Sequence, residues 1–419
     1  MSRLHRGLVC LIPISAVAVL SLAIGLGVSL ANLMAVVNSP LFMSTALAIS
    51  ILAFRRGEIR RVLLLGAMLS AALAALIVVR GGVPPDRWRL VALGFWLAAF
   101  LVCAHRTAKA TGVERLRAFD QTLVVLALPL TVLLTVTGLW TAAKIVHSTY
   151  DNYFYVFDGL LPFPIARAVA QFCASHRWAW DTCTVIYNEF LLVLCAFVVL
   201  RWGKDGRAAG EVLGRWIVAT LVGYALYYSL PGVGPDVAFY GASGSYLESL
   251  PAPPQQVELA LLSGFDAWPN AMPSLHATWA FLIALISIEM TVWAWSFGAI
   301  YAVATIIATL GLREHYLIDL VVAVPFALAV HAGMGLMEHK GSRRRQFVAA
   351  LGGAAMTVGW LLVIRYGTAP LRNFPSAATC LVLATILVSG WLTFRSEAEK
   401  RTSASAPSAG TQTATASRA

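Results

Sequence analysis

The sequence has little charge for its length. Of its 419 residues, 12% are Asp, Glu, Lys or Arg, whereas 59% are hydrophobic and the mean hydropathy is +0.76. A soluble globular protein has about 25% charged and roughly 45–50% apolar residues. The scarcity of charge therefore argues against a soluble enzyme, a disordered protein and a small disulfide-rich secreted domain. The remaining class is an all-α, polytopic helical membrane protein.

Cysteine is also scarce, and its spacing is not that of a metal site. The six cysteines form no CxxC and no Cys/His pattern typical of zinc, so a zinc site is not indicated. We expect no cofactor. Cys173 and Cys183 fall in one segment predicted to lie outside the cytoplasm. Either they form a disulfide, if that compartment is oxidising, or they are two small buried thiols. The sequence favours neither.

Long apolar runs predict about twelve transmembrane helices. They cover residues 8–37, 41–54, 62–80, 89–104, 119–147, 184–200, 212–230, 272–290, 292–312, 316–337, 347–365 and 376–394. The Ser/Ala/Thr-rich end of the chain cannot bury a core, which predicts a disordered tail over 395–419.

The basic residues predict the orientation of these helices. Alternate connections, together with both termini, hold 22 of the 31 Lys and Arg residues. The positive-inside rule then places both termini in the cytoplasm. The formal net charge of +11 is thus a feature of the cytoplasmic surface, and no nucleic-acid partner is expected.

Two polar segments lie on the opposite, outer side. Residues 150–181 mix Trp, Tyr and Phe with Asp and Arg, which is typical of a segment in the headgroup layer. This segment either anchors the bundle or forms a wall of a lipid-entry site. Residues 231–271 form a long Gly/Pro/Ser-rich connection, and such loops are often functional.

Two histidines and one aspartate are predicted at the outer ends of helices. Either Ser274 is the N-cap or Pro273 is the first helical residue, and in both cases His276 lies in the first turn of a helix, whose N-terminus suits a phosphate. His315 and Asp319 are four residues apart, on one face of a helix. Asp319 can then accept from one ring nitrogen of His315 and leave the other free to attack. A lone histidine at a helix end is more often a capping or interfacial residue, but the three together favour a catalytic site.

These residues resemble a known family. Pro273-Ser274-Leu275-His276 and His315-Tyr316-Leu317-Ile318-Asp319 are similar to the second and third motifs of the type 2 phosphatidic acid phosphatase (PAP2) superfamily. The PSLH and HYxxD forms, with Tyr187 and the stretch from Tyr150 to Asp158, resemble the branch of inositol phosphorylceramide synthases. The resemblance covers residues 119–337 and implies a six-helix catalytic core, flanked by an N-terminal module (1–118) and two C-terminal helices (338–394).

The resemblance also implies roles. His315 would form a phosphohistidine, Asp319 would orient it, and His276 would protonate the leaving group and then activate the acceptor. The chain departs from the superfamily in lacking a KxxxxxxRP motif and in having Thr309 where an arginine is usual. Because phosphoryl transfer needs cationic or N–H donors, Arg313 and then Lys144 are the candidate phosphate-binding cations, with Ser274 and Tyr187 as further substrate contacts.

The function expected is a membrane lipid phosphotransferase of the inositol phosphorylceramide synthase type, acting on a phospholipid at the outer face. Water as the acceptor would instead make the protein a lipid phosphate phosphatase. A twelve-span transporter is a third interpretation, but it predicts ionisable groups near the bilayer midplane, whereas this chain places them at helix ends. The Ala/Arg-rich composition favours a bacterial inner membrane, with the site on the periplasmic side.

Overall fold

The computed structural model of the chain describes residues 24–25, 58–79, 87–202, 206–240, 257–261, 268–338 and 342–405. The helices predicted at 8–37 and 41–54 lie outside the described residues, apart from Ile24 and Gly25, and so does the tail beyond residue 405. The helix that includes residues 376–394 continues to Ser405, into the stretch predicted to be disordered.

The described residues are almost entirely helical, as predicted. The helices are α4 (Ile59–Val79), α5 (Arg87–Lys109), α6 (Gly112–Ile145), α7 (Asp151–Gly159), α8 (Ile165–Ser175), α9 (Arg177–Asn188), α10 (Phe190–Trp202), α11 (Gly206–Ser229), α12 (Pro235–Tyr240), α13 (Leu275–Ser287), α14 (Val292–Gly311), α15 (Leu317–Met337), α16 (Arg343–Leu362), the π-helix η1 (Val363–Gly367), α17 (Thr368–Leu371) and α18 (Pro375–Ser405). Strands β1 (Ser148–Thr149) and β2 (Ala260–Leu261) pair antiparallel, with Ser148 opposite Leu261.

The count of twelve membrane-spanning helices is not supported. Among the described residues, six helical segments are long and apolar enough to cross a membrane, and a seventh crossing results if the bent pair α9–α10 is one span. The six segments are Val91–Lys109, Ala208–Ser229, Val292–Gly311, Leu317–Met337, Arg343–Leu371 and Pro375–Arg395. Several apolar helices of this length fit an integral membrane protein.

Two of the predicted spans differ from the structure for physical reasons. The run at 272–290 forms only the 13-residue α13, because the chain stays non-helical before the Ser274 cap. At 1.5 Å per residue this helix is about 20 Å long, less than the roughly 30 Å of a bilayer core. The run at 184–200 is broken at Glu189, where α9 and α10 meet at 48°.

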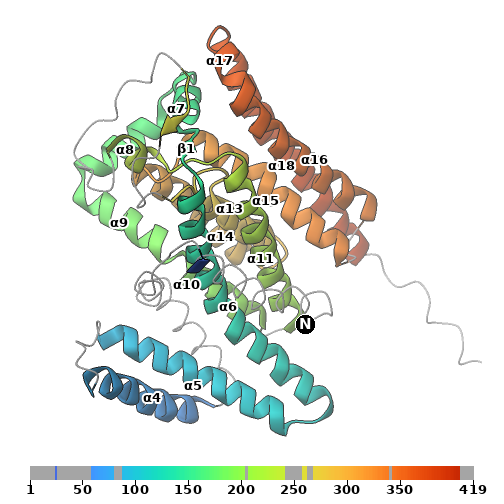
Figure 1. Cartoon of the computed structure of the whole chain (residues 1–419). Helices are drawn as coiled ribbons and strands as arrows, with labels where there is room; N and C mark the ends of the chain where they lie inside the picture. The colour runs from blue at the N-terminus through green and yellow to red at the C-terminus, as the bar shows by residue number, and fades with distance from the viewer. Residues whose placement is uncertain are drawn as a thin grey trace, which may run out of the picture.

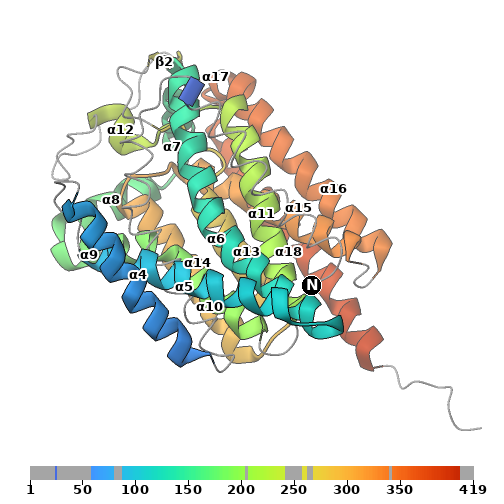
Figure 2. The same ribbon diagram turned by 60° about the horizontal axis from the view of Figure 1, so that its bottom comes forward.

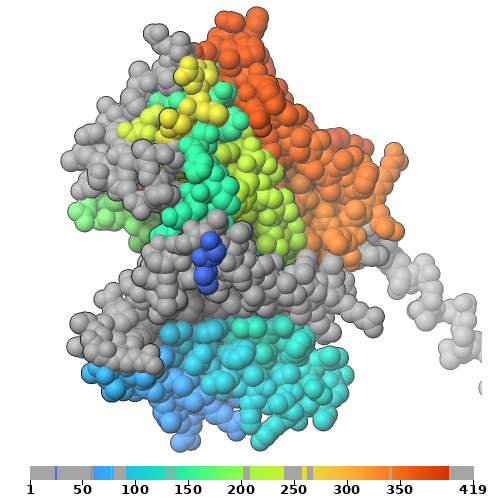
Figure 3. Space-filling model, in the orientation of Figure 1, coloured from blue at the N-terminus to red at the C-terminus, as the bar shows by residue number. Residues whose placement is uncertain are grey.

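Helix α15 lies at the centre of the bundle. It packs against α13 and α11 on one side and against α16 and α18 on the other, and Figures 1 and 2 show α16 and α18 running along its outside. Apart from Asp319 and His331 its sequence is apolar, as expected of a helix surrounded by others. Helices α4 and α5 form a hairpin at one end of the molecule, coloured blue in Figure 3, and join the bundle through the long α6.

The end of the bundle where α11 begins and α15 ends holds buried and partly buried ion pairs. Arg215 on α11 donates two hydrogen bonds of 2.8 Å to the carboxylate of Glu338, and both side chains are buried. Beside them, Arg201 lies 3.4 Å from Glu289 and 3.7 Å from Glu211. These contacts tie together the ends of four helices. The opposite end, where α13 and α15 begin and the predicted catalytic residues lie, is called the catalytic end below.

Candidate active site

The two histidine motifs meet at the catalytic end of the bundle. The backbone N–H of Ser274 donates to the carbonyl of Asp319 at 3.3 Å, so the first turns of α13 and α15 are in direct contact. The backbone N–H of Ala271 donates to Gly232 at 2.8 Å, which joins the loop after α11 to the same point. His276 and His315, which are 39 positions apart in the sequence, thereby lie at the same end of the molecule, as the sequence predicts.

His315 has its ring orientation fixed by two acceptors. Its Nδ1 lies 3.0 Å from the carbonyl oxygen of Ala271 and 3.5 Å from Oδ2 of Asp319. A carbonyl oxygen only accepts, so the proton of the neutral imidazole resides on Nδ1 and the lone pair on Nε2. Asp319 was predicted to be the orienting acceptor, and the structure places the Ala271 carbonyl closer than Asp319 to the same nitrogen.

Asp319 also organises the start of α15. Its Oδ2 accepts the backbone N–H of Tyr316 at 2.9 Å, which is the side-chain half of a capping box. The Asp319 side chain is therefore fixed by the helix start and, in turn, faces His315. Both side chains are buried, with 1% of His315 and none of Asp319 exposed.

His276 lies in an aromatic setting. Its ring stacks on that of Tyr187, with the centroids 3.9 Å apart and the planes at 25°. The rings of Phe190 and Trp279 lie edge-on to it, with centroid distances of 6.0 and 5.6 Å. His276 is also close enough to His315 for an electrostatic interaction between the two rings. The predicted acid–base residue is thus held beside the predicted nucleophile, and Tyr187 is its support.

A cavity of about 350 Å³ opens beside His276. Its lining combines polar side chains, among them His276, Asn188, Asn270 and Glu314, with aromatic and aliphatic side chains from α6, α10, α11 and α13. The lining residues are Thr135, Leu139, Tyr187, Asn188, Phe190, Leu191, Trp216, Trp268, Asn270, His276, Trp279 and Glu314. The cavity is therefore amphipathic, and the break between α9 and α10 places Tyr187, Asn188 and Phe190 in its wall. His315, next to Glu314 in sequence, is not among the lining residues.

Arg313 adopts an unusual backbone conformation directly before the histidine. Helix α14 ends in a Schellman motif, in which Glu314 N–H donates to Thr309 and Arg313 N–H donates to Leu310, both at 3.1 Å. Arg313 occupies the left-handed position of this motif, with φ of 58°, where glycine is usual. A non-glycine residue there stores strain that often marks a functional position. The Arg313 side chain is buried.

Arg313 and Glu314 pack against the loop after α11. The backbone N–H of Asp236 donates to the carbonyl of Arg313 at 3.0 Å. Gly234 has φ of +86°, and a Cβ there would overlap with the carbonyl oxygen of Glu314. Burial raises the pKa of Asp236, and the nearby Arg313 charge opposes this shift. Burial also raises the pKa of Glu314, with the neighbouring His315 acting in the opposite direction.

The other predicted substrate contacts have different outcomes. Ser274 is the N-cap of α13, as predicted, and its Oγ accepts the N–H of Ala277 at 3.3 Å. Lys144 lies in the last turn of α6 and does not line the cavity. Thr309 is fully buried and donates to the carbonyl of Ile306 at 2.9 Å. Its side chain is thus committed within α14, and Arg313, one turn later, is the arginine nearest to His315 in sequence.

Two acidic residues were not predicted to belong to the site, although they fall within the 150–158 stretch that resembles the family. Asp151 is fully buried and accepts the N–H groups of Val233 and Gly234 at 3.1 Å and the hydroxyl of Tyr316 at 2.9 Å. Asp158 accepts the N–H groups of Leu317 and Ile318 at 2.6 and 3.0 Å. Burial raises the pKa of Asp151 to about 6 and that of Asp158 to about 8.

Asp151 and Asp158 do not line the cavity beside His276. They hold backbone segments near it in place. Asp158 closes the N-terminus of α15 by accepting N–H groups that have no partner inside the helix. Asp151 joins α7, the loop after α11 and Tyr316 in one buried cluster. Periodicity does not identify such residues, because their partners are backbone groups far away in the sequence.

Cys173 and Cys183 lie together, with their sulfur atoms 3.7 Å apart and both buried. They pack on Gly311, where a Cβ would come within 2.6 Å of the Cys173 sulfur. The structure therefore brings the two thiols to one point near the end of α14, as free cysteines. Among the residues that the structure describes, no group of three or more His, Cys, Asp or Glu side chains is arranged to hold a metal ion.

Comparison with known proteins identifies the segment that carries this site. No curated protein and no solved structure matches the chain. Residues 152–333, which include His276, His315 and Asp319, match the family model of the PAP2 superfamily, whose members are phosphatases or phosphotransferases. Helix α6, although it lines the cavity, lies before the matched segment. The part of the chain that builds most of the candidate site is therefore the part that matches the PAP2 superfamily.

Proposed function

We propose that this protein is a membrane lipid phosphotransferase that works through a phosphohistidine on His315. The observation that carries the proposal is a cavity lined by His276 and by both polar and apolar side chains, near the buried His315–Asp319 pair. A phospholipid likewise combines a polar phosphate with apolar chains. The proposal places this chemistry at the outer face of the membrane, with both termini in the cytoplasm.

The first step breaks the phosphoester bond to the leaving alcohol. Nε2 of His315 attacks the phosphorus and forms a P–N bond, while His276 gives a proton to the departing oxygen. The Nδ1 proton of His315 stays on the ring between Ala271 and Asp319, which stabilise the positive charge that develops on the imidazole. Arg313 is the proposed cation for the charge on the phosphoryl oxygens.

The second step breaks the P–N bond. His276, now neutral, takes the proton of an acceptor hydroxyl, whose oxygen attacks the phosphorus and releases His315. If diacylglycerol is the alcohol that leaves, the headgroup phosphate stays on His315, and a lipid alcohol as the acceptor yields a new phospholipid, as in the inositol phosphorylceramide synthases that the motifs resemble. A sugar alcohol as the acceptor would then yield a water-soluble phosphodiester. Water as the acceptor yields a phosphatase that uses the same intermediate.

The test is a product analysis with purified protein in lipid nanodiscs. Defined phospholipids are supplied with and without a long-chain lipid alcohol or a sugar alcohol, and lipids and water-soluble phosphates are separated by mass spectrometry. A new phospholipid, or a water-soluble phosphodiester, that appears only with the added alcohol supports the transferase. Release of phosphate or a phosphomonoester alone would favour the phosphatase. No turnover of any phospholipid by protein that retains its fold would contradict both.

A further inference from the structure

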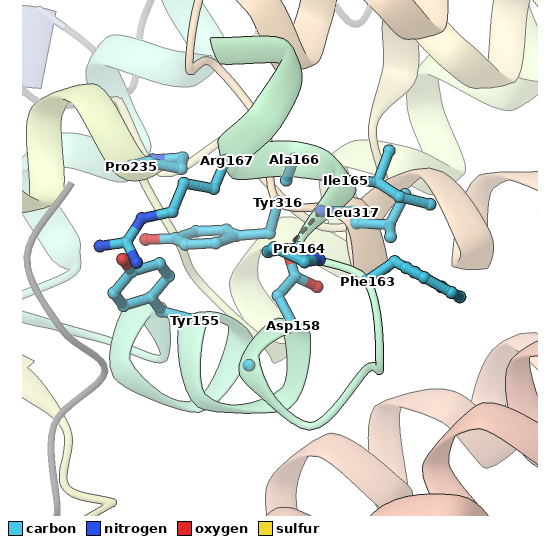
Figure 4. A pocket seen from close by; sticks show the side chains of 11 residues that line it. Tyr155, Asp158, Phe163, Pro164, Ile165, Ala166, Arg167, Pro235, Tyr316 and Leu317 are labelled. Carbon is cyan, nitrogen blue, oxygen red and sulfur yellow. Dashed lines mark hydrogen bonds between the residues drawn. The ribbon is translucent and has the colours of Figure 1, made fainter. Parts of the chain in front are cut away.

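A second cavity lies at the catalytic end and shares no lining residue with the first. Its volume is about 220 Å³, and it is bounded by the end of α7, the start of α8 and the start of α15. Figure 4 shows the residues around it, which are Tyr155, Asp158, Gly159, Phe163, Pro164, Ile165, Ala166, Arg167, Pro235, Tyr316 and Leu317. The proposed chemistry uses none of them as a reacting group, so the cavity requires its own explanation.

One end of this cavity is polar and positively charged. Figure 4 shows the guanidinium of Arg167 beside the hydroxyl ends of Tyr155 and Tyr316. Arginine presents a planar set of donors that matches the oxygens of a phosphate. The nearby Asp158 is directed at the helix, where it accepts the N–H groups of Leu317 and Ile318. Burial raises the pKa of Asp158 to about 8, so near neutral pH this acid repels an anion less than an ordinary carboxylate does.

The other end is apolar and open. Phe163 is 72% exposed and Ile165 is 49% exposed, and Phe172 continues the exposed apolar surface along α8. In a protein with membrane-crossing helices, such exposed apolar side chains beside a polar pocket are suited to lipid chains at the interface. The cavity therefore offers a cation for a phosphate and an apolar rim for a chain.

We propose that this cavity, the Arg167 pocket, is an accessory site for a phospholipid, with Arg167 bound to the headgroup phosphate and the acyl chains along Phe163 and Ile165. The site is separate from the proposed catalytic cavity at His276. Its occupant contacts Tyr316 and Leu317, which directly follow His315, so binding also steadies the segment that begins α15.

The experiment uses a phosphatidylglycerol analogue with a photoactivatable diazirine on the first carbons of an acyl chain. The full-length protein is labelled in nanodiscs, and the crosslinked peptides are mapped by mass spectrometry. Crosslinks in 158–167 report the Arg167 pocket, whereas crosslinks in 187–191 and 268–279 report the catalytic cavity. The two sites are thus measured in one sample, and failure at one does not imply failure at the other.

Arg167→Gln keeps the side-chain size and removes the charge. We expect it to lower crosslinking in 158–167 by roughly tenfold or more, the usual effect of losing a hydrogen bond to a charged group, with crosslinking at the catalytic cavity unchanged. Arg167→Lys should retain part of the signal. The control is Arg177→Gln on the neighbouring helix, where the arginine is exposed and pairs with Asp181.

Three results would overturn the proposal. They are wild-type protein without crosslinks in 158–167, an Arg167→Gln variant with undiminished crosslinks there, and an equal loss in Arg177→Gln.

A competition experiment separates a lipid from a free anion. Unlabelled short-chain phosphatidylglycerol should displace the analogue, and inorganic phosphate at the same concentration should not. Equal displacement by both would make the cavity an anion site rather than a lipid site, contrary to the proposal.

Discussion

The two ends of the helical bundle hold their buried charge in different ways. Where α11 begins and α15 ends, Arg215 and Glu338 form a two-pronged pair of opposite charges. At the catalytic end, the carboxyl groups of Asp151, which is fully buried, and Asp158, which is partly buried, accept backbone N–H groups instead. The first arrangement neutralises charge within the protein. The second fixes the loop after α11 and the start of α15, next to His315, at the end of the bundle where His276 lines a cavity.

Under the proposed function, this difference separates a structural use of rare polar residues from a catalytic one. A closed ion pair holds helices together but presents nothing to a ligand. At the catalytic end, the proton on Nδ1 of His315 leaves Nε2 with a lone pair, and His276 borders a cavity. The comparison predicts that substitutions at the two ends affect different properties, namely stability at one and turnover at the other.

The largest expected effect is at the histidine pair. His315→Ala should lower phospholipid turnover by about 10⁴-fold or more, because the attacking group is lost. His276→Ala should lower it by about 10²–10⁴-fold, the range for general acid–base catalysis. Both variants should keep a thermal unfolding midpoint close to that of the wild type. His147→Ala, at an exposed position after α6, is the control and should be fully active.

At the opposite end, Arg215→Ala should act on stability. Removing one member of a buried ion pair leaves the other charge unpaired, at a cost of about 3–5 kcal/mol. The folded yield and unfolding midpoint should fall, whereas the turnover of the protein that does fold should change little. Replacing both partners, as Arg215→Met with Glu338→Leu, should restore most of the stability. If Arg215→Ala instead abolished turnover in stably folded protein, the separation between the two ends would be wrong.

At the catalytic end, Arg313→Gly should change stability and activity in opposite directions. Glycine favours the left-handed conformation at the end of α14, so this substitution should stabilise the fold by up to about 1 kcal/mol. Loss of the proposed phosphate-binding cation should lower turnover by roughly 10²–10³-fold. Arg313→Lys, which keeps the charge, should retain more activity than Arg313→Gly. A fully active Arg313→Gly variant would show that the strained arginine has no role in the reaction.

A smaller effect is expected on the pH dependence of stability. Burial raises the pKa of Asp158 from 3.8 to about 8. Between these values the folded chain holds a proton that the unfolded chain has lost, so stability falls as pH rises through this range. Asp158→Asn is neutral throughout and should flatten the fall in unfolding midpoint between pH 5 and pH 8. Asp181→Asn, on the surface of α9, should keep the wild-type slope.

The sequence predicts much of this site because its motifs are short and lie at helix starts. Ser274 is the predicted cap of α13, and the spacing of His315 and Asp319 places them on one face of α15. The hydrogen bond of His315 to the Ala271 carbonyl could not be predicted, and neither could those of Asp151 and Asp158 to backbone N–H groups. Each joins a side chain to the backbone of a segment that is distant in the sequence. Among the described residues, hydropathy also predicted more spans than the structure supports, in part because it does not register the short α13 or the break at Glu189.

The central claim is a covalent phosphoryl group on Nε2 of His315, and its direct test is to trap that group. Protein is incubated with a phospholipid that carries ³²P, stopped in alkali, and digested for mass spectrometry, since a P–N bond is stable to base and labile to acid. We predict an acid-labile label on the peptide that contains His315 in the wild type and none in His315→Ala. A label that persists in His315→Ala, or phospholipid turnover by that variant, would contradict the account.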